Sequence, residues 1–244
     1  INKDDTIVCP GILPHIISKK AFDPECARYN AINLAKYAYL HRGKPFYDHI
    51  SSLSMRYSFL QSALPDENFL SNSTTFYTEL RTVGGLGSFP LFWLQFAIAK
   101  LNYSEFVTAK QYLKSAYEMA GRTDFNTYQI DNQYARLMLM ADESIPETPY
   151  ERFCKAEDLL TRQLTDSQDK YPYRAAAALT YFRRYLHNLT TEELAKIKDF
   201  INLIERCEEK LPNDVKEEVF FDMKRIIEVK TYLEKLTPID ESIS

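Results

Sequence analysis

FPLFWLQFAIAKL at residues 89–101 and FVTAKQYLKSAYEMAGR at residues 106–122 are two apolar stretches separated by a short polar turn. In each stretch, small and apolar residues recur every three or four positions, which predicts a pair of amphipathic helices. The residues that share one face are Trp93, Phe96 and Ala97 in the first stretch and Ala109, Leu113 and Ala116 in the second. Two helices approach closely only where side chains are short. The alanines therefore predict a tight helical hairpin, with aromatic rings filling the groove beside the contact.

This pattern resembles the tetratricopeptide repeat, a helix pair of about 34 residues with a Trp and a large–small pair in its first helix. Counted from Pro90, the family's positions coincide with the six residues above without a gap. The chain departs from the family at Lys100, where an aromatic is usual, and at Gly121, where a Pro is usual. The resemblance implies an all-α, right-handed superhelix of antiparallel helix hairpins, a TPR-like α-solenoid. It also implies a concave face that holds a peptide, a partner domain or another copy of the chain, without catalysis.

Composition also favours helices. Only six of the 244 residues are Gly, which disfavours a β-rich fold with many tight turns, whereas 17 Tyr and 15 Phe suit the uneven gaps between stacked helix pairs. The net charge of −4 predicts no bulk attraction to DNA. The sequence shows no signal peptide and no membrane-spanning apolar run, and its four cysteines lack metal-ligand spacing. These features predict a cytoplasmic protein with free thiols and with no metal, cofactor or membrane partner.

The whole chain can be interpreted as helix hairpins. We expect an extended lead-in at 1–22, N-terminal helical hairpins at 23–88, TPR-like repeats at 89–205, and a C-terminal capping helix and tail at 206–244. The expected helices outside the central hairpin cover residues 23–41, 46–63, 68–82, 127–140, 150–164, 171–186, a segment from 191 onward, and 214–236. Thr190 and Glu193 have the spacing of a capping box. Because the chain begins at Ile1 rather than Met, we expect it to be a piece of a longer polypeptide or a processed product.

Polar residues on the helix expected from residue 127 form the candidate partner-binding site. Gln129, Asn132 and Arg136 are three and four residues apart, so they are expected to form one ridge that can hydrogen-bond an extended segment. First helices line the concave surface of a repeat array, which places this ridge where a partner would bind. The alternatives are an internal network between repeats or ordinary solvent exposure. A second basic set consists of Arg174, Arg183 and Arg184, for which a solvated face is the alternative. From this set, Arg174 is the fourth residue that we predict to bind the partner.

Arg42 and His49 form the strongest catalytic candidate. Their Arg-x6-His spacing resembles that of helical ribonucleases of the HEPN type, in which the His acts as general acid or base and the Arg steadies the phosphate charge. A solvated turn is the alternative. The four histidines lack the spacing of a zinc site. The cluster at 84–87 lacks the Gly-Lys-Ser/Thr ending of a P-loop, so we expect a helix-breaking loop there.

Two strings, FWLQFA at 92–97 and QIDNQYAR at 129–136, are similar to repeat segments of bacterial multi-domain proteins. Those proteins pair an NTPase or NAD-cleaving effector with a helical sensor in antiphage defence. This resemblance implies a recognition or assembly module, the sensor or scaffold part of a larger protein. The competing hypothesis is a small helical ribonuclease that acts through Arg42 and His49.

Overall fold

The computed structural model describes residues 32–38, 40, 41, 43, 56, 69–82 and 85–236. Within these residues all regular structure is helical and there is no strand, which confirms the predicted all-α class. The chain forms two compact units, Ile1–Phe125 and Asn126–Ser244. This boundary falls inside the segment 89–205 that was expected to form the repeats. In the described part of the chain, no helix is both long and apolar enough to cross a membrane.

The N-terminal predictions are described only in part. The lead-in expected at 1–22 lies outside the described residues, and so does the helix expected at 46–63 apart from residue 56. Residues 32–38 and 40 are helical, as predicted for the helix at 23–41.

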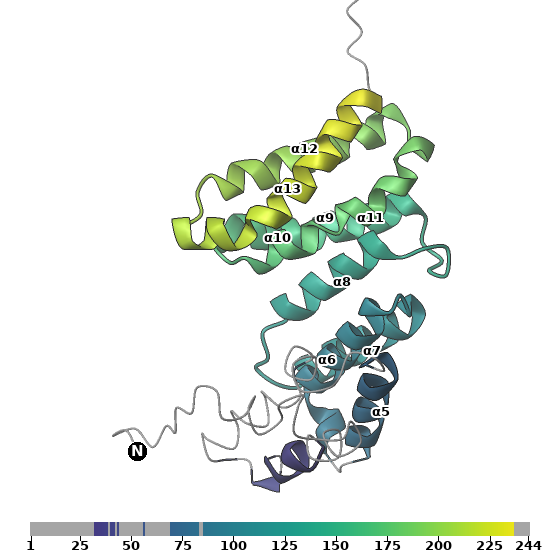
Figure 1. Ribbon diagram of the computed structural model, residues 1–244, viewed down its shortest axis with the longest axis vertical. Helices are drawn as coiled ribbons and strands as arrows, with labels where there is room; N and C mark the ends of the chain where they lie inside the picture. The colour runs from purple at the N-terminus through teal and green to yellow at the C-terminus, as the bar shows by residue number, and fades with distance from the viewer. Residues whose placement is uncertain are drawn as a thin grey trace, which may run out of the picture. The chain divides into compact units, whose positions relative to one another are not determined.

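The first unit is built on the predicted hairpin (Figure 1). Helix α6 (Pro90–Asn102) packs against α7 (Phe106–Ala120), and α5 (Phe69–Arg81) and the short η2 (Leu86–Ser88) pack against α6. Five of the six residues predicted to form the hairpin contact are buried: Phe96, Ala97, Ala109, Leu113 and Ala116. The small side chains therefore lie at the contact between the two helices, as predicted.

Trp93, the sixth residue of the pattern, is half-buried against the core of the first unit. Its indole Nε1 donates a hydrogen bond to the Gly87 carbonyl oxygen at 2.7 Å. The Arg81 guanidinium and the Tyr112 ring each lie 5.5 Å from the indole centroid. The predicted packing of Trp93 among neighbouring helices is confirmed, and its indole also joins η2 to α6.

Lys100, the main departure from the repeat pattern, is buried and paired. Its Nζ lies 2.9 Å from both carboxylate oxygens of Glu105 and 3.2 Å from Thr74 Oγ1. Glu105 is the residue directly before α7, so the ion pair spans the turn of the hairpin. A charged side chain is tolerated at this buried position because its ammonium group keeps three hydrogen-bond acceptors.

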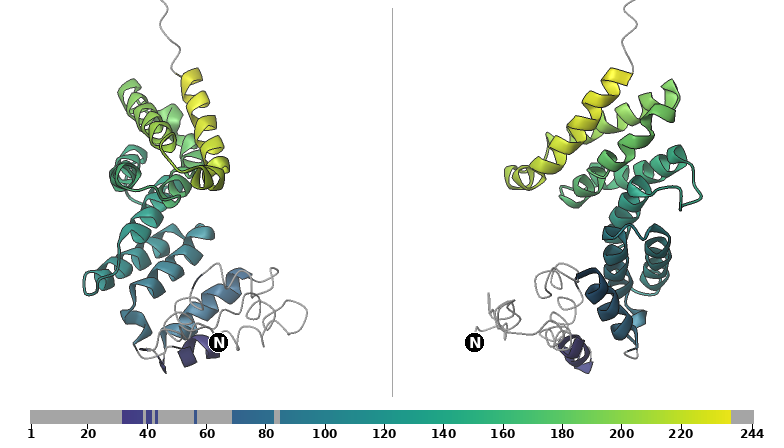
Figure 2. Two further views of the ribbon diagram at one scale, coloured as in Figure 1. Left: turned by 90° about the vertical axis from the view of Figure 1, so that its left-hand side faces the viewer. Right: turned by 45° about the vertical axis from the view of Figure 1, so that its right-hand side comes forward.

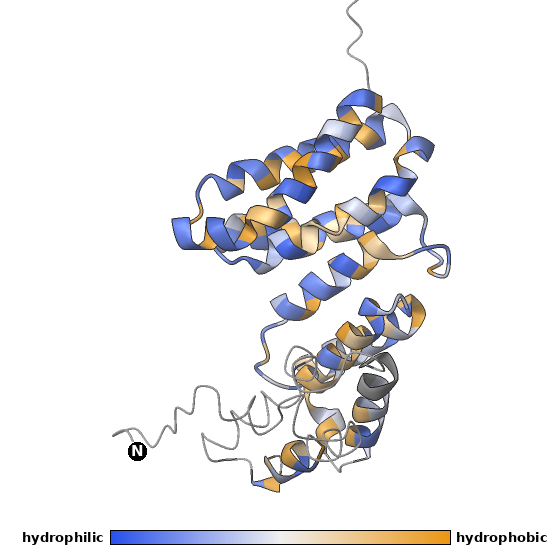
Figure 3. Cartoon of the chain, viewed as in Figure 1, coloured by the Kyte–Doolittle hydropathy of each residue, from blue (hydrophilic) through white to orange (hydrophobic). Residues whose placement is uncertain are grey.

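The second unit has two layers of helices (Figure 2). Its elements are α8 (Tyr128–Met140), α9 (Pro149–Asp166), α10 (Tyr171–Ala176), α11 (Leu179–Phe182), η3 (Arg183–Asn188), α12 (Thr191–Glu208) and α13 (Asn213–Leu236). In one layer the α10–α11 segment lies between α8 and α13 and contacts both, and in the other α9 contacts α12. Because α9 packs on α8 and α12 packs on α13, the two layers are joined at both ends. Figure 3 shows hydrophobic and hydrophilic residues alternating along α12 and α13, as amphipathic helices require.

The helix expected over 171–186 is wrong as a single element. The structure divides this segment into α10, α11 and η3. Between α10 and α11 the backbone forms tighter i→i−3 hydrogen bonds, from Ala178 to Ala175 and from Thr180 to Ala177. The Thr180 hydroxyl also donates to the Ala177 carbonyl oxygen at 2.8 Å. This side-chain competition for a backbone carbonyl is a physical reason for the break.

Two capping boxes fix where the long helices of the second layer begin. The predicted pair, Thr190 and Glu193, makes both reciprocal hydrogen bonds at the start of α12. Thr148 and Glu151 make the same pair at the start of α9, where the sequence carries the same Thr-x-x-Glu signal.

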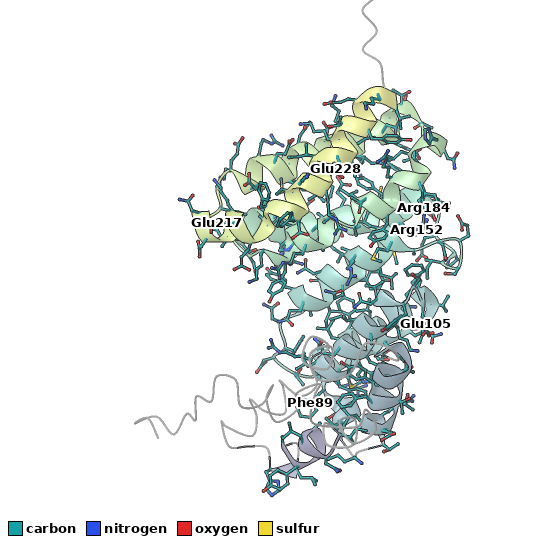
Figure 4. All side chains as sticks on the ribbon, in the orientation of Figure 1. Phe89, Glu105, Arg152, Arg184, Glu217 and Glu228 are labelled. Carbon is teal, nitrogen blue, oxygen red and sulfur yellow. The ribbon has the colours of Figure 1, made fainter. Side chains whose placement is uncertain are left out.

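The long connection between α8 and α9 is held by arginines (Figure 4). Arg152 is only 1% exposed, donates to the Asp142 carbonyl oxygen and lies 4.8 Å from the Tyr185 ring centroid. Arg184 lies 4.8 Å from the same ring and donates to the carbonyl oxygens of Met140 at 2.7 Å and Ala141 at 2.8 Å. The two guanidinium groups therefore satisfy carbonyl groups at the C-terminal end of α8, where positive charge is favoured.

Candidate functional site

A cleft of about 390 Å³ opens on the layer formed by α8, the α10–α11 segment and α13. Its lining residues come from all of these elements: Asn132, Gln133 and Arg136 from α8; Tyr171, Arg174, Ala175, Ala177, Ala178 and Tyr181 from the α10–α11 segment; and Asp222 and Arg225 from α13. The cleft thus combines residues that are up to 93 positions apart in the sequence, from 132 to 225. Its volume lies within the roughly 300–1,000 Å³ of small-ligand sites.

The apolar part of the cleft combines small and aromatic side chains. Ala175, Ala177 and Ala178 are buried, and their methyl groups leave room that larger side chains would fill. Tyr171 and Tyr181 are 45% and 46% exposed, so each ring presents much of its surface to an incoming group. Exposed tyrosines give large contact area with few rotatable bonds, which is why they are frequent in binding sites.

The charged part of the cleft is dominated by three arginines. Arg174 lies 3.3 Å from the Glu218 carboxylate and 4.0 Å from that of Asp222, and its guanidinium lies 5.8 Å from the Tyr171 ring centroid. Arg225 is exposed and forms no ion pair within the described part of the chain. Burial raises the pKa of Asp222 above its ordinary value, and the nearby arginines oppose that shift. With three guanidinium groups and one carboxyl in its lining, the cleft favours an anionic group.

The structure brings three of the four predicted site residues to this cleft. Asn132, Arg136 and Arg174 line it, whereas Gln129 is exposed elsewhere on α8 and does not. The expected ridge is not continuous, because Asn132 is 4% exposed and points into the helix hairpin. Arg136 is half-buried, with its Nη1 3.5 Å from Gln133 Oε1.

Asn132 belongs to a buried amide pair between α8 and α9. Its Nδ2 donates to Gln163 Oε1 at 2.9 Å, and Gln163 Nε2 lies 3.4 Å from the Tyr128 carbonyl oxygen. The Asn132 Oδ1 atom accepts no hydrogen bond from any described residue. Asn132 therefore fits the alternative interpretation, an internal network, while it also lines the edge of the cleft.

Of the second basic set, only Arg174 lines the cleft. Arg184 holds the α8–α9 connection, and the Arg183 guanidinium lies 3.9 Å from the Tyr232 ring centroid. Four further functional candidates line the cleft that the sequence pattern did not indicate, namely Tyr171, Tyr181, Asp222 and Arg225. A sequence signal exists for two of them, because Asp222 and Arg225 are three residues apart on a predicted helix and therefore share a face.

The ionisable side chains of the lining are three arginines, two tyrosines and Asp222, and the guanidinium groups stay charged at any physiological pH. Arg42 and His49, the proposed catalytic pair, lie outside the described residues. Among the residues that the structure does describe, no group of His, Cys, Asp or Glu could hold a metal ion.

Comparison of the chain with models of protein families, with curated proteins and with solved structures finds no match.

Proposed function

We propose that this chain is a non-catalytic protein–protein interaction module, with TPR-like helix hairpins that hold a peptide or partner domain. The observation that carries the proposal is the cleft on α8, the α10–α11 segment and α13, where three arginines and two exposed tyrosines surround a floor of alanines. In the bacterial defence proteins that the sequence resembles, such a module is the sensor or scaffold part of a larger protein.

The packing of the hairpins supports the repeat interpretation. The first unit contains a hairpin with the family's residue pattern buried at its contact. In the second unit, Ala156 and Leu160 of α9 repeat the small–large spacing of Ala109 and Leu113, and all four are buried. A curved array of such hairpins presents its first helices on the concave side, and the cleft lies on that layer.

The chemistry of the cleft favours a segment with an acidic side chain or a free carboxylate. A guanidinium group offers a planar fork of donors that matches a carboxylate. The exposed rings of Tyr171 and Tyr181 can pack against an adjacent apolar or aromatic side chain. The cleft therefore selects an acidic residue next to a bulky one.

Selection from a displayed library of random peptides on the full chain tests the proposal. We expect the selected peptides to be rich in Asp and Glu and to bind at least about tenfold more weakly to the double variant Arg174→Gln, Arg225→Gln, since a hydrogen bond to a charged group contributes about 1.5–3 kcal/mol. Arg162→Gln is the matched control, because Arg162 is exposed on α9 in the other layer. If no peptide is selected, or if the double variant binds as the wild type does, the cleft is not the partner site.

The ribonuclease hypothesis has a separate test. Purified chain and the His49→Ala variant are incubated with RNA under identical conditions. Our proposal expects no cleavage by either protein. Cleavage by the wild type that the variant lacks would replace the proposal by the enzyme hypothesis.

A further inference from the structure

A second depression, which we call the α12–α13 groove, lies between the end of α12 and the first half of α13. It has a volume of about 860 Å³. Its lining residues are Glu205, Glu208 and Glu209 from the end of α12 and its C-terminal boundary, and Lys216, Glu217, Phe220, Met223, Lys224 and Ile227 from α13. None of these residues lines the cleft described above.

The floor of the groove is an apolar stripe along α13. Phe220, Met223 and Ile227 are three and four residues apart, so they follow one side of the helix. Met223 is buried, whereas Phe220 is 61% exposed and Ile227 is 44% exposed. Seven residues of α-helix separate Phe220 from Ile227, which makes the stripe about 10 Å long, or two helical turns. Single exposed apolar residues are ordinary, but two exposed apolar side chains on either side of buried Met223, along one groove, are typical of a docking site.

The rim of the groove is acidic. Four carboxylates and two ammonium groups line it, which gives a formal charge of −2 from −4 and +2. Glu205 is paired with Lys230, with Oε2 2.6 Å from Nζ. In the part of the chain that the structure describes, Glu208, Glu209 and Glu217 form no ion pair, and Lys216 donates to the Glu209 backbone carbonyl oxygen at 2.9 Å. Three carboxylates on the rim are therefore available to an approaching cation.

The position of these acids strengthens the negative potential. Glu205, Glu208 and Glu209 lie at the C-terminal end of α12, where backbone carbonyl groups already carry partial negative charge. Acids at this end of a helix are unfavourable for the isolated chain, whereas they are usually found at the opposite end. A positively charged group bound here would offset that repulsion.

We propose that the α12–α13 groove binds an amphipathic helix of a partner protein that combines bulky apolar side chains with Lys or Arg. The apolar residues would cover Phe220 and Ile227, and the basic residues would approach Glu208, Glu209 and Glu217. A dimer formed by two copies of this groove would place glutamates opposite glutamates. An anionic lipid surface would meet the same repulsion. Charge complementarity thus favours a basic helix over both of these alternatives.

Three fluorescein-labelled peptides of about 14 residues test the chemistry by fluorescence anisotropy on the full chain. The first is a Leu/Lys peptide patterned as an amphipathic helix, the second replaces Lys by Glu, and the third replaces Leu by Ser. Because the arginine cleft is itself proposed to bind acidic segments, the three peptides are compared on the full chain that carries Arg174→Gln and Arg225→Gln. In this background we expect only the Leu/Lys peptide to bind, because it alone supplies both the apolar face and the positive charge.

Neighbouring phenylalanines provide a matched pair of variants. Phe220→Ala should weaken binding of the Leu/Lys peptide at least about tenfold, because Phe220 is the most exposed apolar side chain that lines the groove. Phe221→Ala should weaken it less than about twofold, because Phe221 is 75% exposed but does not line the groove. Both side chains are mostly exposed, so both variants should keep the wild-type thermal unfolding midpoint. The variant Glu208→Lys, Glu217→Lys should lose the Leu/Lys peptide and gain the Leu/Glu peptide.

The proposal is overturned if the Leu/Glu peptide binds the Arg174→Gln, Arg225→Gln protein as well as the Leu/Lys peptide does, or if the two phenylalanine variants weaken binding equally. It is also overturned if sedimentation shows a dimer that Phe220→Ala converts to a monomer while no peptide binds, which would identify a second copy as the occupant. The variant Arg174→Gln, Arg225→Gln should bind the Leu/Lys peptide normally, so failure of the cleft and failure of the groove are distinguishable.

Discussion

Replacing Arg152 tests how the second unit holds its long connection. The guanidinium group is buried, donates to the Asp142 carbonyl oxygen and lies against the Tyr185 ring. Its Nε atom has no hydrogen-bond partner among the described residues, so the side chain is held by one carbonyl, one aromatic ring and the packing of its methylene groups. Arg152→Ala removes all three contributions at once.

The size of the loss follows from these contacts. A hydrogen bond from a charged group contributes about 1.5–3 kcal/mol, a desolvated cation–π contact about 2 kcal/mol, and the two buried methylene groups that alanine lacks about 0.8 kcal/mol each. The gains total about 5–7 kcal/mol. Burial of an ion costs several kcal/mol, which alanine relieves. We therefore expect Arg152→Ala to lower the free energy of unfolding by about 3 kcal/mol. Arg152→Met, which keeps most of the apolar packing, should lower it by about 1 kcal/mol.

Urea unfolding followed by far-UV circular dichroism measures the effect. With a slope of about 2 kcal/mol per M, the alanine variant should unfold at about 1.5 M less urea. Hydrogen exchange of residues 141–148 should also become faster, because these residues form the connection that Arg152 holds. Arg162→Ala on the exposed side of α9 is the control and should change the free energy by less than about 0.5 kcal/mol. A methionine variant at least as stable as the wild type would refute the reasoning, because the contacts would then not exceed the cost of desolvation.

Three further predictions concern other contacts. Glu105→Gln removes the carboxylate that pairs with buried Lys100 and should lower the free energy of unfolding by about 1–2 kcal/mol. Trp93 fluorescence during urea unfolding measures the effect, and an unchanged free energy would contradict a stabilising ion pair. Thr190→Ala removes the side-chain cap of α12 and should cost about 1 kcal/mol in thermal unfolding, whereas Thr191→Ala, one residue further on, should cost less. Asp222 has a raised pKa in the folded chain, so its contribution to stability is present below the ordinary Asp pKa of 3.8 and is lost as the pH rises through the folded pKa. In urea unfolding, the free energy of unfolding of Asp222→Asn minus that of the wild type should therefore increase as the pH rises across that window. A decrease would mean that the pKa of Asp222 is lowered, not raised, by folding.

The hairpin α6–α7 could be predicted from sequence because its determinants are local. The spacing of Trp93, Phe96 and Ala97 on one helix and of Ala109, Leu113 and Ala116 on the next is a periodic pattern, and a periodic pattern fixes which face is buried. The capping box at Thr190 is local for the same reason. The capping box at Thr148 has the same local signal, but it lies at the end of the polar, proline-containing connection 141–148, which hides where α9 begins.

The cleft could be predicted only in part because it depends on contacts that are distant in sequence. Asn132, Arg136 and Arg174 were identified as polar residues on predicted helices, but their surroundings depend on α13 packing beside α10 and α11. The break after Ala176 arises from hydrogen bonds of Thr180 and its neighbours, which helix propensity does not indicate. The burial of Arg152 depends on Tyr185, 33 positions later in the chain, and no short-range pattern connects the two.

The buried and the exposed residues of the cleft have different roles, and this difference affects how the protein can diversify. The alanines of its floor are buried and fix the packing of α10 and α11, whereas Tyr171, Arg174, Tyr181 and Arg225 project from the same layer into solvent. Replacements at these four exposed positions alter the chemistry of the opening without disturbing the interior. A lineage could therefore retarget its recognition preference through a few surface changes while the helical framework stays as it is.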